Sequence, residues 1–249
     1  MSEVFLSAVI PTKNEARRLP ETLAAAVRFF SGTGWKWELV VADASSPDGT
    51  AEVAREYGAR VVSVPHSACK GENVRAGMLV AAGRWRLMAD ADGATPWEET
   101  GRLLEAGADV VVGRRPFSRP GQPLLRKVAG WAFAAAQYPL TGVPDSQCGF
   151  KLFSAQAAEG VFRRLAETGF AFDVEAIVLA KKLGFRVVSV PVKWADRDGS
   201  TVTLARGMKA FGALAKMYLR LAAGELEVRG CPGGSSGWQW SRQRLGRSC

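Results

Sequence analysis

The sequence is almost without histidine, since its 249 residues contain only His66. A catalytic triad that uses histidine, or a metal site with several histidine ligands, is therefore not expected. Cysteine is scarce as well, and no two of the four cysteines have CxxC spacing. Neither a zinc knuckle nor a dense disulfide framework is indicated, and we expect reduced thiols.

Long apolar stretches are also missing. No window approaches the roughly 18–20 uninterrupted apolar residues of a membrane span, and the N-terminus lacks a signal-peptide pattern. Together with the cysteine usage, these absences predict a cytoplasmic protein. Nucleotide-binding glycine motifs are absent too: GTG at 32–34 lacks the remaining GxxG spacing, and no GxxxxGK(S/T) occurs.

Acidic side chains are outnumbered by basic ones, 24 to 33, which gives a net charge of +9. Such a surface favours anionic partners: nucleic acid, an acidic membrane surface or phosphorylated substrates. No recognisable nucleic-acid-binding module accompanies the charge, and we expect no nucleic-acid partner.

What is present is an alternation of short Val/Leu-rich runs with longer helical stretches. Strands are expected at 4–11, 37–43, 59–65, 84–90, 109–114, 149–153 and 185–194. Helices are expected at 15–31, 50–57, 71–82, 97–106, 124–138, 155–166 and 173–183. This pattern predicts an α/β fold, with a mostly parallel sheet and helices on both of its faces.

The C-terminal region differs from the rest. Residues 206–224 can form a helix with a basic stripe at Lys209, Lys216 and Arg220. Two readings stay open: a helix on an acidic bilayer surface, or a terminal helix packed on the domain. Residues 225–249 are rich in Gly, Ser and Arg without periodicity. We expect one domain over 1–224 and a disordered tail over 225–249.

Three of the expected strands end in polar loops, PTKNE, DASSPDGT and DADGATP. Open α/β sheets bind ligands at the carboxyl ends of their strands, so these loops should converge on one site. Asp90 and Asp92, two residues apart on an expected strand, point to the same side and can approach one Mg²⁺ or Mn²⁺ ion. Two alternatives are a charged turn and a phosphatase nucleophile, but a DxDx(T/V) pattern fails because Ala94 stands at its last position.

Other polar residues at the same expected edge favour a nucleotide-sugar. Asp43 closes the second strand, where a carboxylate can accept hydrogen bonds from a base or ribose, and Asn14 and Glu15 follow the first strand. Lys70 and Arg75 bring positive charge to the start of a helix, an environment suited to phosphate.

These segments resemble glycosyltransferase family 2, which has the GT-A fold; the resemblance is carried by VIPTKNEARRLPETL, VVADASSPDGT, KGENVRAGML and LMADADGATP. DSQCGFKLF, FAFDVEAIVLA and VKWADRDGST are similar to dolichyl-phosphate glucosyltransferases and, less closely, to polyprenyl-phosphate mannosyltransferases. The resemblance implies an inverting hexosyltransferase that moves glucose from UDP-glucose to a polyprenyl or dolichyl phosphate. It also implies peripheral contact at the cytoplasmic face of a membrane, through helix 206–224 and the region of Trp131–Phe133.

The resemblance assigns roles by position. Pro11, Asn14, Glu15 and Asp43 would hold the nucleoside, with Lys70 and Arg75 near it or the phosphates. Asp90 and Asp92 would bind Mg²⁺ or Mn²⁺. Arg114, Arg115 and Arg126 stand where the family keeps basic residues for the acceptor phosphate, and Asp145 opens the acceptor-side loop. Asp92, Asp145, Arg114 and Arg126 are the expected catalytic residues. Arg197 and Ser200 belong to a late loop that would close over the donor, and both are expected, with Arg115, at the acceptor phosphate.

Two motifs depart from the family pattern. ADAS has one acid where many members have two, and Thr201 replaces a frequent basic residue. The alternatives left open are mannose from GDP-mannose, a soluble acceptor, and a protein that binds a nucleotide-sugar or nucleic acid without turnover.

Overall fold

The computed structural model describes residues 3–65, 69–116, 124–169, 171–195 and 204–224, and only the backbone of 124–127 and 204–208. In this part of the chain seven strands form one sheet, in the order β3-β2-β1-β4-β6-β5-β7. The strands are β1 (Leu6–Thr12), β2 (Trp37–Asp43), β3 (Arg60–Ser63), β4 (Trp85–Met88), β5 (Val110–Arg114), β6 (Lys151–Ser154) and β7 (Val187–Pro191).

The sheet is mostly parallel, as predicted. Strand β6 alone runs antiparallel to its two neighbours, β4 and β5. The remaining pairs, including β1 with β2 and β1 with β4, are parallel. The carboxyl ends of β1, β2 and β4 therefore lie next to one another at one edge.

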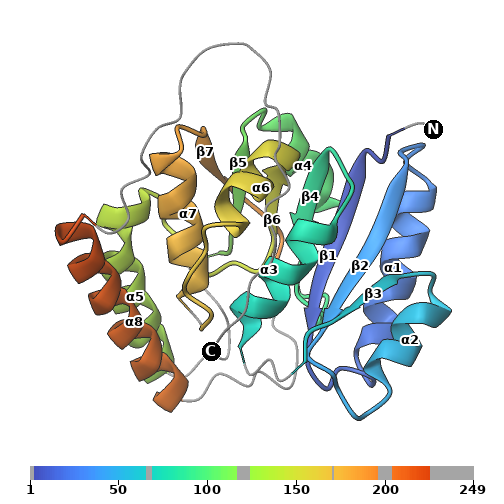
Figure 1. The fold of residues 1–249 in the computed structure, drawn as a ribbon, viewed down its shortest axis with the longest axis horizontal. Coiled ribbons are helices and arrows are strands. Elements are labelled where there is room, and N and C mark those ends of the chain that lie inside the picture. The colour runs from blue at the N-terminus through green and yellow to red at the C-terminus, as the bar shows by residue number, and fades with distance from the viewer. Residues whose placement is uncertain (1–2, 66–68, 117–123, 170, 196–203, 225–249) are drawn as a thin grey trace, which may run out of the picture.

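Helices cover both faces of the sheet (Figure 1). Buried side chains of α1 (Leu19–Ser31), α2 (Thr50–Glu56) and α4 (Glu99–Glu105) pack on one face. Those of α3 (Lys70–Val80), α6 (Ala155–Phe162) and α7 (Phe172–Lys182) pack on the other. Strand residues alternate between these two cores, since Val9 contributes to one and Ala8 and Ile10 to the other.

Two further helices, α5 (Leu124–Thr141) and α8 (Leu204–Ala222), lie side by side at one flank, where α5 packs on α7 (Figure 1). Leu214 of α8 is buried, the Tyr218 hydroxyl donates to the Ala136 carbonyl at 2.7 Å, and the rings of Phe133 and Phe211 meet edge to face. The structure thus packs the C-terminal helix on the domain. Arg220 leaves the expected exposed stripe and turns inward to Glu175. The tail expected at 225–249 lies outside the described residues.

The loops after β1 and β2 are bound to each other. The Thr12 hydroxyl donates to the Asp43 carboxylate at 2.9 Å, and the backbone amides of Asn14 and Glu15 donate to the hydroxyls of Ser46 and Thr50. The third polar loop follows β4, the other neighbour of β1. The convergence of the three loops at one edge is confirmed.

Candidate active site

Asp90 and Asp92 lie in a turn after β4, which ends at Met88. The strand expected from the sequence ended at Asp90, with strand alternation bringing the two carboxylates together, and that detail is wrong. The chain bends because Gly93 adopts a left-handed conformation, with φ of 63°. The turn is held in place by the Thr22 hydroxyl, which donates to the Ala91 carbonyl at 2.8 Å. Turn geometry, rather than strand alternation, brings the two carboxylates to the same edge.

Lys70, the first residue of α3, forms an ion pair with Asp90 at 2.5 Å. Burial alone would raise the pKa of the Asp90 carboxyl, but the Lys70 ammonium, together with Lys151 and Arg115, lowers that pKa. At Asp92, burial and then the negative charge of Asp90 raise the pKa of the carboxyl. The site therefore holds one carboxylate that a lysine neutralises and a second whose charge lacks comparable compensation.

A glycine makes room for Asp90. Met88 of β4 pairs with Lys151 of β6, so the same register continued by two residues sets Gly149 opposite Asp90. A Cβ atom added at Gly149 would overlap the Asp90 carboxylate. Only glycine leaves the space that the carboxylate occupies.

The site fits a divalent cation that arrives with a phosphate ligand. Asp90 gives one oxygen to Lys70, and Asp92 gives one to the amide of Ala94 at 3.0 Å. Each carboxylate keeps a second oxygen with no hydrogen bond to the described residues. Within those residues no cluster of three or more His, Cys, Asp or Glu side chains is present. Mg²⁺ and Mn²⁺ suit this set, because such ions take one or two carboxylates together with phosphate oxygens.

Two buried charged residues near this turn have no role in the sequence analysis. Lys151 donates to the Asp173 carboxylate at 2.5 Å, and their side chains are only 1% and 6% exposed. Burial raises the pKa of Asp173 even though Lys151 and Lys70 oppose it. Two features of the sequence could have pointed to this buried pair: a lysine at a core-facing position of GFKLF, and an aspartate in the apolar segment FAFDVEAIVLA.

Replacing Lys151 by methionine is expected to destabilise the protein by about 3 kcal/mol, because a buried carboxylate loses its partner. The double variant Lys151→Met/Asp173→Leu should recover much of that loss. Urea unfolding measures both. The exposed Arg55–Glu52 pair is the control, since Glu52→Gln should change stability by less than about 1 kcal/mol. A Lys151→Met variant as stable as wild type would contradict this account.

Arg115 and Asp145, both expected on the acceptor side, are brought together in the structure. The guanidinium donates to both carboxylate oxygens, at 2.8 and 2.7 Å, and lies 5.9 Å from the ring centre of Trp194. Burial would raise the pKa of Asp145, but the hydrogen bonds from Arg115 lower it. Arg115 is thus held between a carboxylate and an indole ring. Arg114 precedes it at the end of β5.

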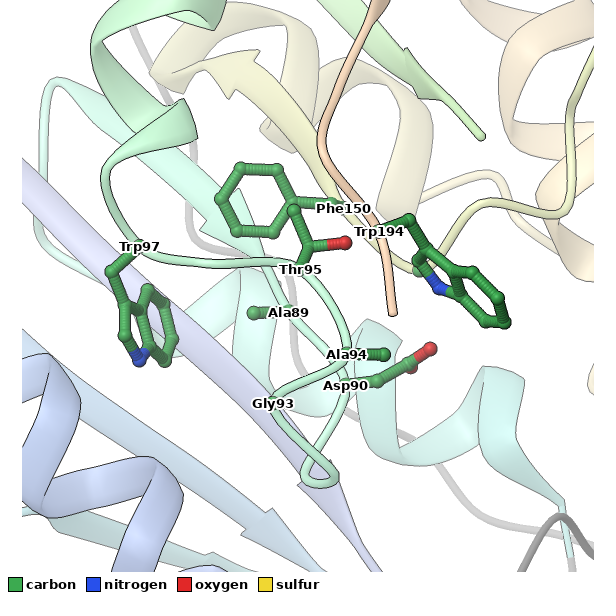
Figure 2. Close-up of a pocket in the computed structure, with 9 residues that line it drawn as sticks. Ala89, Asp90, Gly93, Ala94, Thr95, Trp97, Phe150 and Trp194 are labelled. Carbon is green, nitrogen blue, oxygen red and sulfur yellow. The ribbon is translucent and has the colours of Figure 1, made fainter. Parts of the chain in front are cut away.

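A pocket beside the Asp90 turn is drawn in Figure 2. Asp90 and Trp194 lie together at one end of it, and Trp97 lies at the other. Trp97 is buried and donates to the Thr22 carbonyl, which makes it a wall of the pocket. Trp194, which the sequence analysis left without a role, is the aromatic surface nearest to Asp90 in this view.

The expected nucleoside residues lie at the joined ends of β1 and β2. Pro11 is buried within β1 and Asn14 adopts a left-handed conformation with φ of 56°. Asp43 is buried and accepts from Thr12 and from the amide and hydroxyl of Ser46. Glu15 forms a bidentate pair with Arg18. Both carboxylates therefore organise these loops internally.

Some of the expected site residues do not join the cluster. Arg75 is exposed on α3 and donates to the Phe162 carbonyl at the end of α6, and no hydrogen bond or ion pair among the described residues joins it to Asp90 or Asp92. The side chain of Arg126 is outside the described residues, as are Arg197 and Ser200.

Curated relatives share the sequence over most of its length. The chain is 31% identical to a dolichyl-phosphate beta-glucosyltransferase of Trichomonas vaginalis over 231 residues, which cover 83% of this chain and 71% of that protein. A dolichyl-phosphate beta-glucosyltransferase of Dictyostelium discoideum is 30% identical and covers 80% of this chain and 69% of its own.

Solved structures share the fold. Glucosyl-3-phosphoglycerate synthase from Mycobacterium tuberculosis, in complex with UDP, has a TM-score of 0.64 at 20% identity and covers 85% of this chain and 79% of its own. Mannosyl-3-phosphoglycerate synthase from Rubrobacter xylanophilus has a TM-score of 0.62 at 20% identity, with coverages of 93% and 79%. The M. tuberculosis enzyme is also solved with Mn²⁺ and UDP-glucose. The expected GT-A fold is confirmed.

The sequence pattern of the family described as "Glycosyl transferase family 2" matches residues 7–162, which include β1, β2, β4 and the Asp90 turn. This chain belongs to glycosyltransferase family 2.

Proposed function

We propose that the protein transfers glucose from UDP-glucose to the phosphate of a polyprenyl or dolichyl phosphate, with inversion at the anomeric carbon. The observation that carries the proposal is the Asp90–Asp92 turn, with Lys70 against it, at the ends of the strands of a family 2 fold. Relatives with about 30% identity, named dolichyl-phosphate beta-glucosyltransferases, support the sugar and the acceptor.

The donor side is assigned to the joined ends of β1, β2 and β4. The loops around Asn14, Glu15 and Asp43 would bind the nucleoside. Asp90 and Asp92 would hold Mg²⁺ or Mn²⁺ against the diphosphate. When bound, the cation supplies charge neutralisation for the departing nucleoside diphosphate. The chain's own contribution is to fix Asp90, through Lys70 and the space at Gly149, and to leave one oxygen of Asp92 without a hydrogen bond to the described residues.

The proposed reaction forms one C–O bond and breaks another. An oxygen of the acceptor phosphate attacks the anomeric carbon, and the bond from that carbon to the diphosphate breaks, so that its electron pair leaves with UDP. A phosphate monoester is anionic near pH 7, because its second pKa is about 6, and no strong general base is needed. This requirement suits a chain whose sequence contains a single histidine. Arg114 and Arg115 are the described cations that would orient the acceptor phosphate.

The acceptor would reach the site from a lipid surface on the cytoplasmic side. Among residues with described side chains, all the large hydrophobic ones that are exposed lie on α5 and α8: Val128, Trp131, Tyr138, Phe211, Tyr218 and Leu219. In the described part of the chain, no helix has the length and hydropathy needed to cross a membrane. A patch of aromatic and aliphatic side chains on a basic protein suits an anionic lipid surface.

The double variant Trp131→Ser/Leu219→Ser tests this surface. These side chains are 52% and 71% exposed, so their loss should disturb the fold little. Affinity for vesicles that contain an anionic lipid should fall about tenfold or more, because each side chain contributes roughly 1.5 kcal/mol or more when buried. Vesicle co-sedimentation measures the affinity, and metal-dependent UDP binding should stay at the wild-type level. Unchanged vesicle binding would remove α5 and α8 from the lipid contact.

A donor screen tests the proposed sugar and base. Purified protein is incubated with Mg²⁺ or Mn²⁺, a short polyprenyl phosphate and, in separate reactions, UDP-glucose, UDP-N-acetylglucosamine and GDP-mannose. Metal-dependent glycolipid from UDP-glucose is the expected result. Product from GDP-mannose alone would show that the proposed sugar and base are both wrong and that the donor is GDP-mannose. The same Asp90–Asp92 site would still be required.

A further inference from the structure

Arg220 lies on α8, beyond the residues that the family pattern matches, yet it is connected to the proposed donor site. Its guanidinium forms an ion pair with Glu175 of α7 at 3.0 Å. Glu175 is fully buried, whereas Arg220 is partly exposed. Burying a carboxylate is costly unless hydrogen bonds and a cation compensate it, so this contact is more than a surface ion pair.

The other oxygen of Glu175 organises the loop between α6 and α7. It accepts hydrogen bonds from the backbone amides of Ala166 and Glu167, at 3.0 and 2.5 Å. Glu167 in turn accepts from the amide of Gly169 at 2.8 Å. A single buried carboxylate therefore joins α8 to the loop 166–169.

The loop bears directly on the first turn of α3. The Gly71 amide donates to the Thr168 carbonyl at 2.9 Å. A Cβ atom added at Gly71 would lie 2.7 Å from the Thr168 oxygen and 2.9 Å from the Phe172 Cβ, so loop and helix are in close contact. Lys70, the residue before Gly71, holds Asp90. A shift of the loop therefore moves the lysine that fixes the metal-binding turn.

Side-chain packing between α8 and this loop is incomplete. A cavity separates them, lined by Ala166, Glu167, Ala213, Lys216, Met217 and Arg220. Helix α8 packs mainly on α5. The Arg220–Glu175 ion pair spans this gap, beside the buried side chains of Leu214 and Met217.

We propose that Arg220 is a positioning residue for the donor site, which acts through Glu175 and the loop 166–169 on Lys70 and Asp90. The inference rests on the proposed function for its kinetic consequence, but the structural coupling stands independently of it. It also links the helix proposed to touch lipid with the site proposed to bind the donor, so that the seating of α8 sets the geometry of the metal-binding turn.

The test compares Arg220→Gln, Arg220→Lys and the control Arg55→Gln, which breaks an exposed ion pair on α2 with the same change of charge. Hydrogen exchange followed by mass spectrometry reads the coupling without any substrate. Arg220→Gln should accelerate exchange in 166–169 and in the first turn of α3, and leave α1 and β2 unchanged. Arg220→Lys should restore part of the protection, and Arg55→Gln should match wild type.

Kinetics are the second readout. If the proposed reaction is observed, Arg220→Gln should lower kcat/KM for the donor about tenfold, because a small displacement of a positioned group is costly. Its melting temperature should fall, because the buried Glu175 carboxylate loses its cation, so both readouts are taken well below the melting transition. Wild-type exchange around Gly71 in Arg220→Gln would overturn the coupling, as would faster exchange throughout the chain, which indicates a merely structural role. Absence of turnover in the wild-type protein would refute the proposed function and leave the exchange result to decide the coupling.

Discussion

Asp92→Asn is expected to lower kcat for sugar transfer by about a thousandfold or more, because the carboxylate proposed to hold the cation against the departing diphosphate is lost. The fold should remain intact. The pKa of Asp92 is raised in the folded protein, so its charged form is disfavoured there, and removal of the charge relieves the folded state at neutral pH. An asparagine oxygen can still accept the hydrogen bond from Ala94.

Steady-state kinetics and thermal melting measure the two halves of this prediction. The matched control is Asp109→Asn at the opposite end of the sheet, where the carboxylate accepts from the Arg186 amide. That variant can lose some stability but should keep its kcat. Near-normal turnover in Asp92→Asn would remove the carboxylate from the reaction.

Gly149→Ala is expected to reduce kcat/KM about a hundredfold, since a displacement of about 1 Å at a positioned group has an effect of this size. The added Cβ atom would overlap the Asp90 carboxylate, and the short side chain of Asp90 must leave Lys70 to avoid it. Residue 149 itself need not touch any substrate for this loss to occur.

Gly101→Ala provides the control, because a Cβ atom there meets nothing within 4 Å. In the middle of α4 it should stabilise the protein by about 0.5–1 kcal/mol and leave activity unchanged. Kinetics at saturating and at limiting metal concentration separate a loss of turnover from a loss of metal affinity, since displacement of Asp90 should weaken metal binding as well. A Gly149→Ala enzyme with wild-type kinetics would show that Asp90 need not hold its observed position.

The layered architecture follows from the sequence because apolar runs of 4–8 residues alternate with amphipathic stretches. The joining of three polar loops follows from the parallel order of β1, β2 and β4. The reversed direction of β6 does not, because an apolar run such as GFKLF carries no sign of its direction. Only the register with β4 and β5 reveals it, and that register is what sets Gly149 opposite Asp90.

The site is predictable where its chemistry lies in one short segment. Asp90 and Asp92 are two residues apart, and their pairing is evident from the sequence alone. The Lys151–Asp173 and Arg115–Asp145 pairs join residues 22 and 30 positions apart in the chain. Their partners are decided by tertiary packing, and so is the inward turn of Arg220. Glu15 and Asp43 were expected to face a nucleoside, but local hydrogen bonds within their loops already engage them.

The most direct test of the central claim is the transfer of labelled glucose from UDP-glucose to a polyprenyl phosphate by the purified 249-residue chain. The reaction is run with Mn²⁺, with Mg²⁺ and with a chelator, and 3-phosphoglycerate competes as a soluble acceptor. We predict label in the organic phase only when metal is present, no effect of the competitor, and an inverted anomeric configuration in the product. Label that appears on the soluble acceptor alone, or lipid product that forms equally well with the chelator, would contradict the account.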